Sequence, residues 1–289
     1  MRSLILCLLT AFALPVAATA ANGPAVREET DVVFGKGGDT DLKLDLAMPA
    51  DGDGPFPAVV CIHAGGWVGG KRQEMSQTIR TLAGRGYVAV SPDYRLATAH
   101  ARFPAQVEDC KAAVRWLRAN AVKYKIDPDH IGVVGFAAGG HLACMLGVTD
   151  KEDGLDGAGG NADVSSRVQA VVSFFGPTDL TAKDWGPGVS ERNLVPLLGG
   201  TLEEKPEAYR KASPLTYAGK NAAPLLLFHG AADKMVLVDQ SRWMAEKIAS
   251  AGGVAELVVV EGEGHGFRSE KLLQCLGKMV TFFDERLKP

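Results

Sequence analysis

The sequence predicts an α/β fold, in which helices cover both faces of a mostly parallel sheet. Three observations support this class. Continuous apolar runs such as "PAVVCIH" and "PLLLFHG" recur along the chain, as is typical of strands buried on both faces. Amphipathic segments of helical period alternate with these runs, which indicates right-handed crossovers between parallel strands. No internal repeat or long linker interrupts the alternation, so residues 21–289 are expected to form one domain.

The predicted elements begin near residue 31 and follow in order. "LKLDLAM" (42–48) alternates apolar and polar residues, as a half-buried strand does. The runs expected to form buried strands are 57–63, 87–93, 130–136, 168–175, 224–230 and 255–262. Apolar residues at three- and four-residue steps predict two helices. The first helix follows Pro104, with Val107, Cys110, Val114, Leu117 and Ala121 on its apolar face. The second ends the chain, with Leu272, Leu276, Met279, Phe283 and Leu287.

Two segments break the alternation. Residues 150–166 are rich in Gly and Asp, which predicts a surface loop. The acidic residues of this loop do not have the spacing of an EF-hand, so no metal site is expected there. Residues 178–217 have weak periodicity and lie between two predicted strands. Because ligands of open α/β sheets bind beyond the carboxyl ends of the strands, this segment is expected to form a small cap over such a site.

The net charge and the N-terminus bear on the class of partner. The formal net charge of −3, without any Lys/Arg cluster, argues against nucleic acid and against binding to a membrane surface. Residues 1–20 combine Arg2, an apolar run at 4–16 and the small residues 18–20, which is the pattern of a signal peptide. We therefore expect a secreted or periplasmic protein without a stable membrane anchor after signal cleavage.

Four cysteines follow the predicted signal peptide. Export makes disulfides possible, but wide spacing and a large domain favour buried free thiols instead. Their spacing relative to histidine does not resemble a zinc site. The four are Cys61, Cys110, Cys144 and Cys275.

The first candidate for chemistry is "CIHAGGW", which follows the predicted strand 57–62. Consecutive glycines let backbone N–H groups approach a reacting carbonyl closely, because no Cβ intervenes. Gly65 and Gly66 are therefore candidate donors of an oxyanion hole. A tight turn without any catalytic role would use the same residues.

The second candidate is "VVGFAAGGHLA", a predicted strand that turns sharply into a helix. Gly135 and Gly139 stand where a Gly-x-Ser-x-Gly nucleophile turn has its glycines, but Ala137 lies between them. The N–H of Ala138, at the start of the helix, would be a further oxyanion donor. By itself the stretch is weak evidence, since turns rich in Gly and Ala are common.

Two more strand ends carry candidate residues. Asp233 follows the strand "PLLLFHG", where it could orient a histidine or simply form a turn or a helix cap. His265 lies between glycines in "VVVEGEGHGF", a position that packing explains poorly. Trp67 and Trp185 are candidate substrate-binding residues, although Trp185 could equally fill the core.

The four stretches follow the chain order of α/β-hydrolases: oxyanion glycines, nucleophile turn, aspartate and histidine. The chain resembles the α/β-hydrolase carboxylesterases with an HGGG-type oxyanion motif, most of all their feruloyl- or acetylxylan-esterase-like branch. "SPDYRLATAHARFPAQVEDCKAAVRWLRAN" and "SSRVQAVVSFFGPTD" belong to the same resemblance, which runs from about residue 31 to the C-terminus. It implies hydrolysis of carboxylic esters with short or aromatic acyl groups, either small molecules or esters linked to a plant glycan. The mechanism it implies is acyl transfer through a serine-bound intermediate, without metal or organic cofactor.

The resemblance also implies roles for two residues, and the chain departs from the family pattern at three positions. His265 would move the proton of a nucleophilic serine, and Asp233 would hold His265. Ala64 replaces the first glycine of the oxyanion motif and Leu237 replaces a proline, both of which are expected to be tolerated. Ala137 replaces the serine itself, so the chain is expected to be nearly inactive.

Several interpretations of Ala137 stay open. A substitution that silences an active enzyme would leave the other site residues in place, as they are here. A natural protein that binds esters or glycans without cleaving them would also carry such a site, and the retained signal peptide fits this alternative. "HAGGW" further resembles the oxyanion segment of arylformamidases, so amide hydrolysis is a third interpretation.

Overall fold

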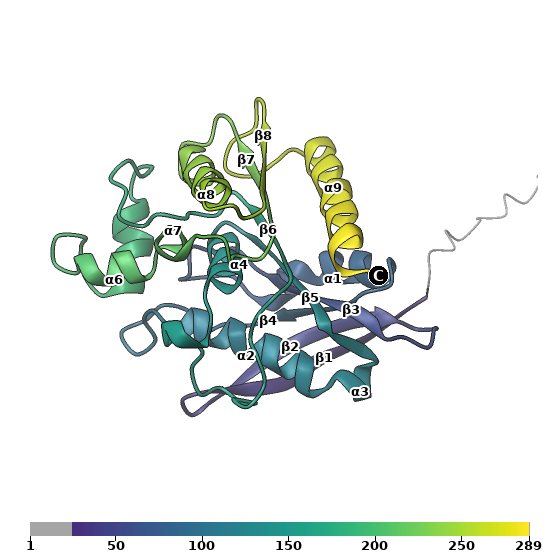
Figure 1. Cartoon of the computed structure of the whole chain (residues 1–289). Coiled ribbons are helices and arrows are strands. Elements are labelled where there is room, and N and C mark those ends of the chain that lie inside the picture. Colours follow the sequence, from purple (N-terminus) through teal and green to yellow (C-terminus); the bar gives the residue numbers. More distant parts are fainter. Residues whose placement is uncertain (1–24, 289) are drawn as a thin grey trace, which may run out of the picture.

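The computed structural model describes residues 25–288, which contain one eight-stranded sheet with helices on both faces (Figure 1). The α/β class predicted from the sequence is therefore confirmed. The strand order is β1-β2-β4-β3-β5-β6-β7-β8, and all pairs from β4 to β8 are parallel. The pairs β1–β2 and β2–β4 are antiparallel. The predicted signal peptide, residues 1–20, lies outside the described residues and stays a prediction.

The strands are β1 (Val26–Gly37), β2 (Thr40–Pro49), β3 (Phe56–Ile62), β4 (Val88–Pro92), β5 (Ile126–Phe136), β6 (Ala170–Phe174), β7 (Leu225–Gly230) and β8 (Ala255–Val260). The α-helices are α1 (Ser76–Ala83), α2 (Ala105–Ala119), α3 (Ala121–Tyr124), α4 (Ala138–Val148), α5 (Val195–Leu198), α6 (Pro206–Lys211), α7 (Pro214–Tyr217), α8 (Asp239–Ser250) and α9 (Ser269–Leu287). Two 3-10 turns, Arg72–Met75 and Lys151–Asp153, and a π-helix, Ser190–Leu194, complete the regular structure.

Each apolar run of the sequence became a strand, whereas β1 has no counterpart among the predicted elements. Most side chains of β1 are exposed or half-buried, so the strand lacks an apolar signature. Its pairing with β2 shifts register between Glu29 and Val32 and again between Val33 and Gly35. These irregularities remove the strict alternation by which an edge strand is recognised.

Two hydrophobic cores lie on the two faces of the sheet. In β3, Val60 and Ile62 join the core under α2, α4 and α8, while Val59 and Cys61 join the core under α1 and α9 (Figure 1). Both faces of the central strands are therefore dry, which explains their continuous apolar runs. The four cysteines of the described residues are buried and unpaired, as their spacing favoured.

The segment between β6 and β7 contains the π-helix and the short helices α5 to α7, which project from one side of the sheet (Figure 1, green). It includes the predicted cap, residues 178–217. The predicted loop 150–166 has a single 3-10 turn as regular structure. Within residues 25–288, no group of His, Cys, Asp and Glu side chains is placed to hold a metal ion. None of the helices described in this range is long and apolar enough to cross a membrane.

Candidate active site

A cavity of about 550 Å³ opens at the carboxyl ends of the central strands, where ligands of α/β sheets bind. It brings together stretches that are far apart in the sequence: the loop after β3, the turn after β5, the cap, and the loops after β7 and β8. The predicted site residues that line it are Gly65, Gly66, Trp67, Ala137, Ala138, Trp185 and His265. Asp233 lies behind His265, to which it is hydrogen bonded.

The turn after β5 has the backbone of a nucleophile turn. Ala137 is the N-cap of α4 and has φ 49° and ψ −114°, a conformation that residues with a Cβ rarely adopt. Strain of this kind costs on the order of 1–3 kcal/mol and concentrates at functional sites. A Cβ on Gly135 would lie 2.0 Å from the carbonyl oxygen of Gly139, and one on Gly139 would lie 2.2 Å from that of Ile62. Both glycines are therefore required by packing, and the strained residue between them faces the cavity.

Three backbone N–H groups beside the cavity are available to a ligand. Those of Gly65, Gly66 and Ala138 donate to no protein acceptor within residues 25–288. All three residues line the cavity together with Ala137. Unpaired donors next to a reacting carbonyl are what an oxyanion hole requires.

Contacts on the far side of the loop set the direction of these donors. In a trans peptide the N–H points away from the carbonyl of the preceding residue. The carbonyl oxygen of Ala64 accepts hydrogen bonds from His63 Nδ1 at 2.7 Å and from the Tyr94 hydroxyl at 3.3 Å, which directs the N–H of Gly65. The carbonyl oxygen of Gly65 accepts from the N–H of Gly69 at 2.9 Å, which directs the N–H of Gly66. Burial lowers the pKa of His63, which favours the neutral form of this side chain.

Trp67 lines the cavity, but its indole N–H is already hydrogen bonded within the protein. The indole N–H donates to Nδ1 of His141 at 3.1 Å, and Nε2 of His141 donates to the carbonyl oxygen of Ala212 at 2.7 Å. Burial lowers the pKa of His141 to about 4. A neutral, fully buried histidine thus anchors Trp67, which offers a ligand only its apolar ring.

Asp233 and His265 form the second half of the site. Nδ1 of His265 donates to Oδ2 of Asp233 at 2.7 Å. Oδ1 of Asp233 accepts from the backbone N–H groups of Met235 at 2.9 Å and Val236 at 3.0 Å. Nε2 of His265 has no protein partner within residues 25–288, and the ring lies edge-on to Phe175 in the cavity wall. The imidazole is therefore oriented by one nitrogen and free to exchange a proton through the other.

His229 is a residue of the site that the sequence did not single out. It is fully buried in β7, and its Nε2 lies 3.3 Å from the same Oδ2 of Asp233 and 2.8 Å from the carbonyl oxygen of Val236. The Ser241 hydroxyl pairs with its Nδ1 at 2.7 Å. Although burial alone would raise the pKa of Asp233, hydrogen bonds from His229 and His265 hold it well below the ordinary range. The sequence signal was the short spacing of the two residues in "FHGAAD".

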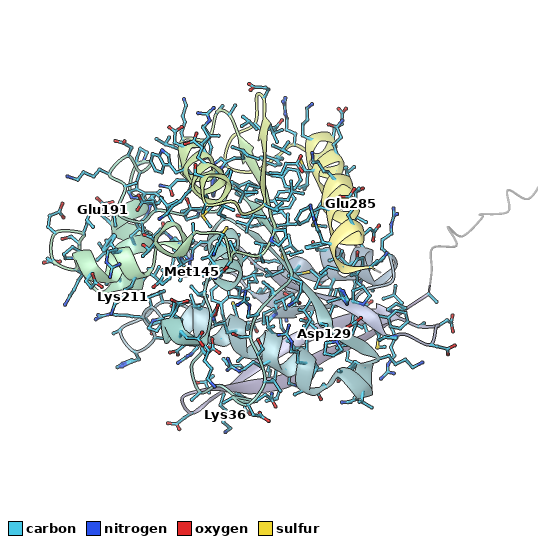
Figure 2. All side chains as sticks on the ribbon, in the orientation of Figure 1. Lys36, Asp129, Met145, Glu191, Lys211 and Glu285 are labelled. Atoms are coloured by element: carbon cyan, nitrogen blue, oxygen red, sulfur yellow. The ribbon has the colours of Figure 1, made fainter. Side chains whose placement is uncertain are left out.

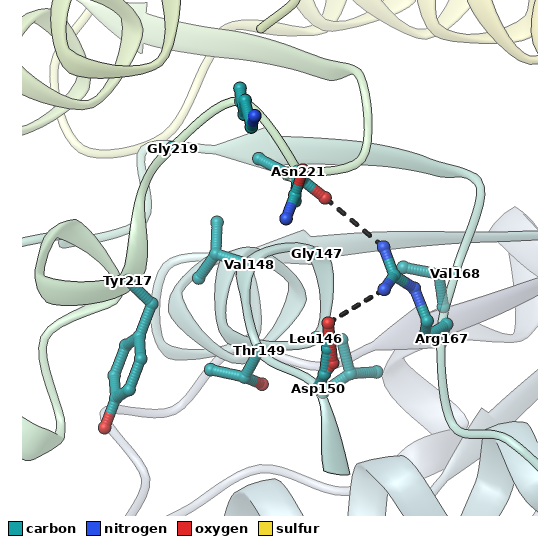
Figure 3. Close-up of a pocket in the computed structure, with 12 residues that line it drawn as sticks. Leu146, Gly147, Val148, Thr149, Asp150, Arg167, Val168, Tyr217, Gly219 and Asn221 are labelled. Atoms are coloured by element: carbon teal, nitrogen blue, oxygen red, sulfur yellow. Dashed lines mark hydrogen bonds and ion pairs between the residues drawn. The ribbon is translucent and has the colours of Figure 1, made fainter. Parts of the chain in front are cut away.

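A second cavity, of about 270 Å³, lies near the amino ends of β6 and β7 (Figure 3). Val168 and Ala222 in its lining precede β6 and β7, whereas the first cavity follows these strands. Arg167 lies across it and donates to Asp150 at 2.8 Å and to the carbonyl oxygen of Asn221 at 3.3 Å. None of the predicted site residues lies there, so the cavity beside Ala137 is the candidate active site.

Comparisons with known proteins show the family of the chain. Residues 44–248 match the family described as BD-FAE. The chain is 32% identical to esterase LipC of Mycobacterium tuberculosis, over 74% of this chain and 53% of that protein. It is 28% identical to esterase LipQ of the same organism, over 78% of this chain and 53% of that protein. The chain thus spans about half the length of the curated relatives that it matches.

Two solved structures resemble the whole domain. One is a truncated carbohydrate esterase from gut microbiota, with a TM-score of 0.82, 29% identity, and coverage of 93% of this chain and 99% of that chain. Another is esterase 2 of Thermogutta terrifontis with propionate bound, with a TM-score of 0.73, 30% identity, and coverage of 93% and 97%. On the family match and these likenesses, the chain belongs to the BD-FAE family and has the α/β-hydrolase fold of the carboxylesterases.

Proposed function

We propose that the cavity is a serine-carboxylesterase site whose nucleophile position is occupied by alanine, so that the chain with Ala137 is nearly inactive. One observation carries the proposal. The strained turn at Ala137, the three unpaired N–H groups and the Asp233–His265 pair all border a single cavity. A buried carboxylate that orients a histidine, next to donors for an oxyanion, is the machinery of acyl transfer.

With serine at position 137, each residue has a defined step. The serine Oγ would attack the ester carbonyl carbon while its proton passes to Nε2 of His265. The carbonyl oxygen would become an oxyanion that accepts hydrogen bonds from the N–H groups of Gly65, Gly66 and Ala138. Collapse would break the bond to the alcohol, which takes the proton from His265. Water, deprotonated by the same nitrogen, would then release the acid. Alanine has no Oγ, so the first bond cannot form.

The cavity wall indicates the acyl group. It is apolar around Phe136, Phe175, Val189 and Met235. The indole N–H of Trp185 is used internally, donating to the carbonyl oxygen of Ala182 at 2.7 Å. A short alkyl or an aromatic acyl group would fill such a space without leaving a polar group unpaired.

The alcohol side of the ester and the location of the protein are part of the proposal. We expect an ester linked to a plant polysaccharide, encountered outside the cytoplasm. The likeness to a carbohydrate esterase from gut microbiota supports the first point. The signal-peptide pattern of residues 1–20 supports the second.

A second candidate function is the binding of esters or glycans without turnover. The observation that favours it is Ala137 itself, in a cavity that is otherwise complete. The two candidates differ in the serine form. An esterase lineage predicts turnover after Ala137→Ser, whereas a binding protein predicts unchanged affinity and no turnover.

The chemical class is tested with matched substrates of the Ala137→Ser form. We expect kcat/KM for p-nitrophenyl acetate and p-nitrophenyl butyrate to exceed that for p-nitroacetanilide by at least about 10³-fold, because p-nitroaniline is a poorer leaving group than p-nitrophenol. Methyl ferulate, followed by ferulate release, tests the aromatic acyl group. A preference for the anilide or for N-formylarylamines would assign the site to amides and contradict the proposal.

A further inference from the structure

One side chain of the cap reaches the loop that carries the oxyanion donors. Nδ2 of Asn193 donates to the carbonyl oxygen of Gly66 at 3.1 Å, although the two residues are 127 positions apart. Asn193 belongs to the π-helix and lines the cavity. A Cβ on Gly66 would lie 1.9 Å from Nδ2, so the loop passes directly against the amide.

The loop needs an external contact because its backbone is easily rotated. Gly65, Gly66 and Trp67 all have positive φ, at 113°, 59° and 63°. Glycine has the greatest backbone freedom, and Trp67 is held in a conformation that costs free energy for a residue with a Cβ. Without a contact from outside, the peptide between Gly66 and Trp67 can turn over at little cost.

The carbonyl groups on either side are fixed by the backbone. That of Gly65 accepts from the N–H of Gly69 at 2.9 Å, and that of Trp67 accepts from the N–H of Ala97 at 2.7 Å. The carbonyl of Gly66 differs, because Asn193 is its one protein donor within residues 25–288. The middle peptide of the loop is thus held by a side chain of the cap.

We propose that Asn193 is a positioning residue for the oxyanion hole, which fixes the Gly66–Trp67 peptide and with it the direction of the Gly66 N–H. The inference rests on the proposed esterase function. Both peptides that flank the Cα of Gly66 are then tied, the first through Gly69 and the second through Asn193. Rotation of the second would change ψ of Gly66 and φ of Trp67 and free the Cα of Gly66 to shift. The first peptide is joined to the second at this Cα, so its Gly66 N–H would no longer be held in one direction toward the oxyanion.

The place of Asn193 in the cap keeps its amide in position. The next residue, Leu194, is fully buried in the core under α2 and α4 and anchors the end of the π-helix. A π-helix is rare and is often found at functional sites. The same cap segment supplies Trp185 and Val189 to the cavity wall. The walls that contact the substrate and the contact that orients the oxyanion donor therefore belong to one structural unit.

The kinetic test uses Asn193→Asp in the Ala137→Ser form. Aspartate has the same shape but cannot donate, and it places an oxygen against the carbonyl of Gly66. We expect kcat for p-nitrophenyl acetate to fall about 10- to 100-fold, as for a misdirected oxyanion donor, with KM within about threefold. Asn193→Ala removes the amide without adding charge, and it should likewise lower kcat while leaving KM nearly unchanged. A kcat within threefold of the Asn193 form in both variants would overturn the proposal, whatever happens to KM.

Glu191→Gln is the matched control, because Glu191 is in the same π-helix but exposed at the outside of the molecule (Figure 2). It should leave kcat and KM unchanged. A loss of kcat equal to that of Asn193→Asp would show a general effect of altering the π-helix and would overturn the specific role of Asn193.

A second measurement separates this inference from the proposed function. In the Ala137 chain, hydrogen exchange of the Val68 and Gly69 amides reports whether their bonds to the carbonyl of Gly65 persist. Asn193→Asp should raise both rates at least about tenfold without affecting β3. If the serine form hydrolyses no ester, the proposed function fails, while the exchange rates still decide the inference. Unchanged rates would overturn the claim that Asn193 orders the loop.

Discussion

The Ala137→Ser form should hydrolyse p-nitrophenyl acetate about 10⁵-fold faster than the Ala137 chain, since removal of the nucleophile from a serine-protease triad costs about 10⁶ in turnover. The substitution adds one oxygen to a Cβ that already borders the cavity. The strained backbone, the unpaired N–H groups of Gly65, Gly66 and Ala138 and the oriented His265 already border this cavity, so the serine needs no rearrangement of the site.

The increase must come from position 137 and not from any hydroxyl in the cavity. Val189→Ser places a hydroxyl elsewhere in the same wall and should stay at the rate of the Ala137 chain. Melting temperatures of all forms establish that they are folded. A folded serine form whose rate stays within tenfold of the Ala137 chain, on acetate, butyrate and ferulate esters alike, would favour a binding protein.

Addition of His265→Asn to the Ala137→Ser form should remove nearly all of this gain, a loss of about 10⁴-fold or more. His265 would accept the serine proton at Nε2, and the amide of asparagine is not basic enough to do so. Asparagine also lacks the imidazole whose Nδ1 donates to Oδ2 of Asp233 at 2.7 Å. Because serine and histidine act as one unit, the two substitutions should be strongly non-additive. In the Ala137 chain, His265→Asn should change the hydrolysis rate little, because that rate is already close to zero.

The non-additivity is measured in a double-mutant cycle. It compares the rates of four forms, which carry Ala or Ser at position 137 and His or Asn at position 265. His100→Asn is the control, because His100 is exposed in a surface loop outside the cavity. A serine form that keeps its rate after His265→Asn would show that another base acts, and the assignment of His265 would be wrong.

The sequence predicted the elements whose burial leaves a clear pattern. Strands dry on both faces, such as β3 and β7, read as continuous apolar runs, and α2 and α9 show a helical period. β1 left no such pattern, because an edge strand with exposed side chains and register shifts has no regular alternation.

In the candidate site, too, the sequence predicted the residues that stand in a recognisable pattern and missed those that do not. Gly65, Ala137 and His265 stand at strand ends in recognisable stretches, and the parallel sheet brings those ends together at one edge. The supporting residues were missed for a different reason. Asn193 lies in a cap without periodicity, and its role depends on one contact with a loop 127 residues away.

His63 and His229 illustrate the limit further. Each is a buried histidine that holds another group, the carbonyl of Ala64 in one case and the carboxylate of Asp233 in the other. In the sequence both resemble ordinary strand-end residues. Only the three-dimensional arrangement shows which acceptor each one contacts.

If residue 137 occupies the nucleophile position of an otherwise assembled site, a serine placed there can be trapped covalently. Paraoxon transfers its diethylphosphoryl group to an activated serine, with release of p-nitrophenolate, and esterase 2 of Thermogutta terrifontis has been solved in a form phosphorylated by paraoxon. We predict that the Ala137→Ser form gains one diethylphosphoryl group, mapped by peptide mass spectrometry to residue 137, while the Ala137 chain gains none. A folded serine form that stays unmodified at residue 137, or equal modification of both forms at another residue, would show that residue 137 is not the nucleophile position.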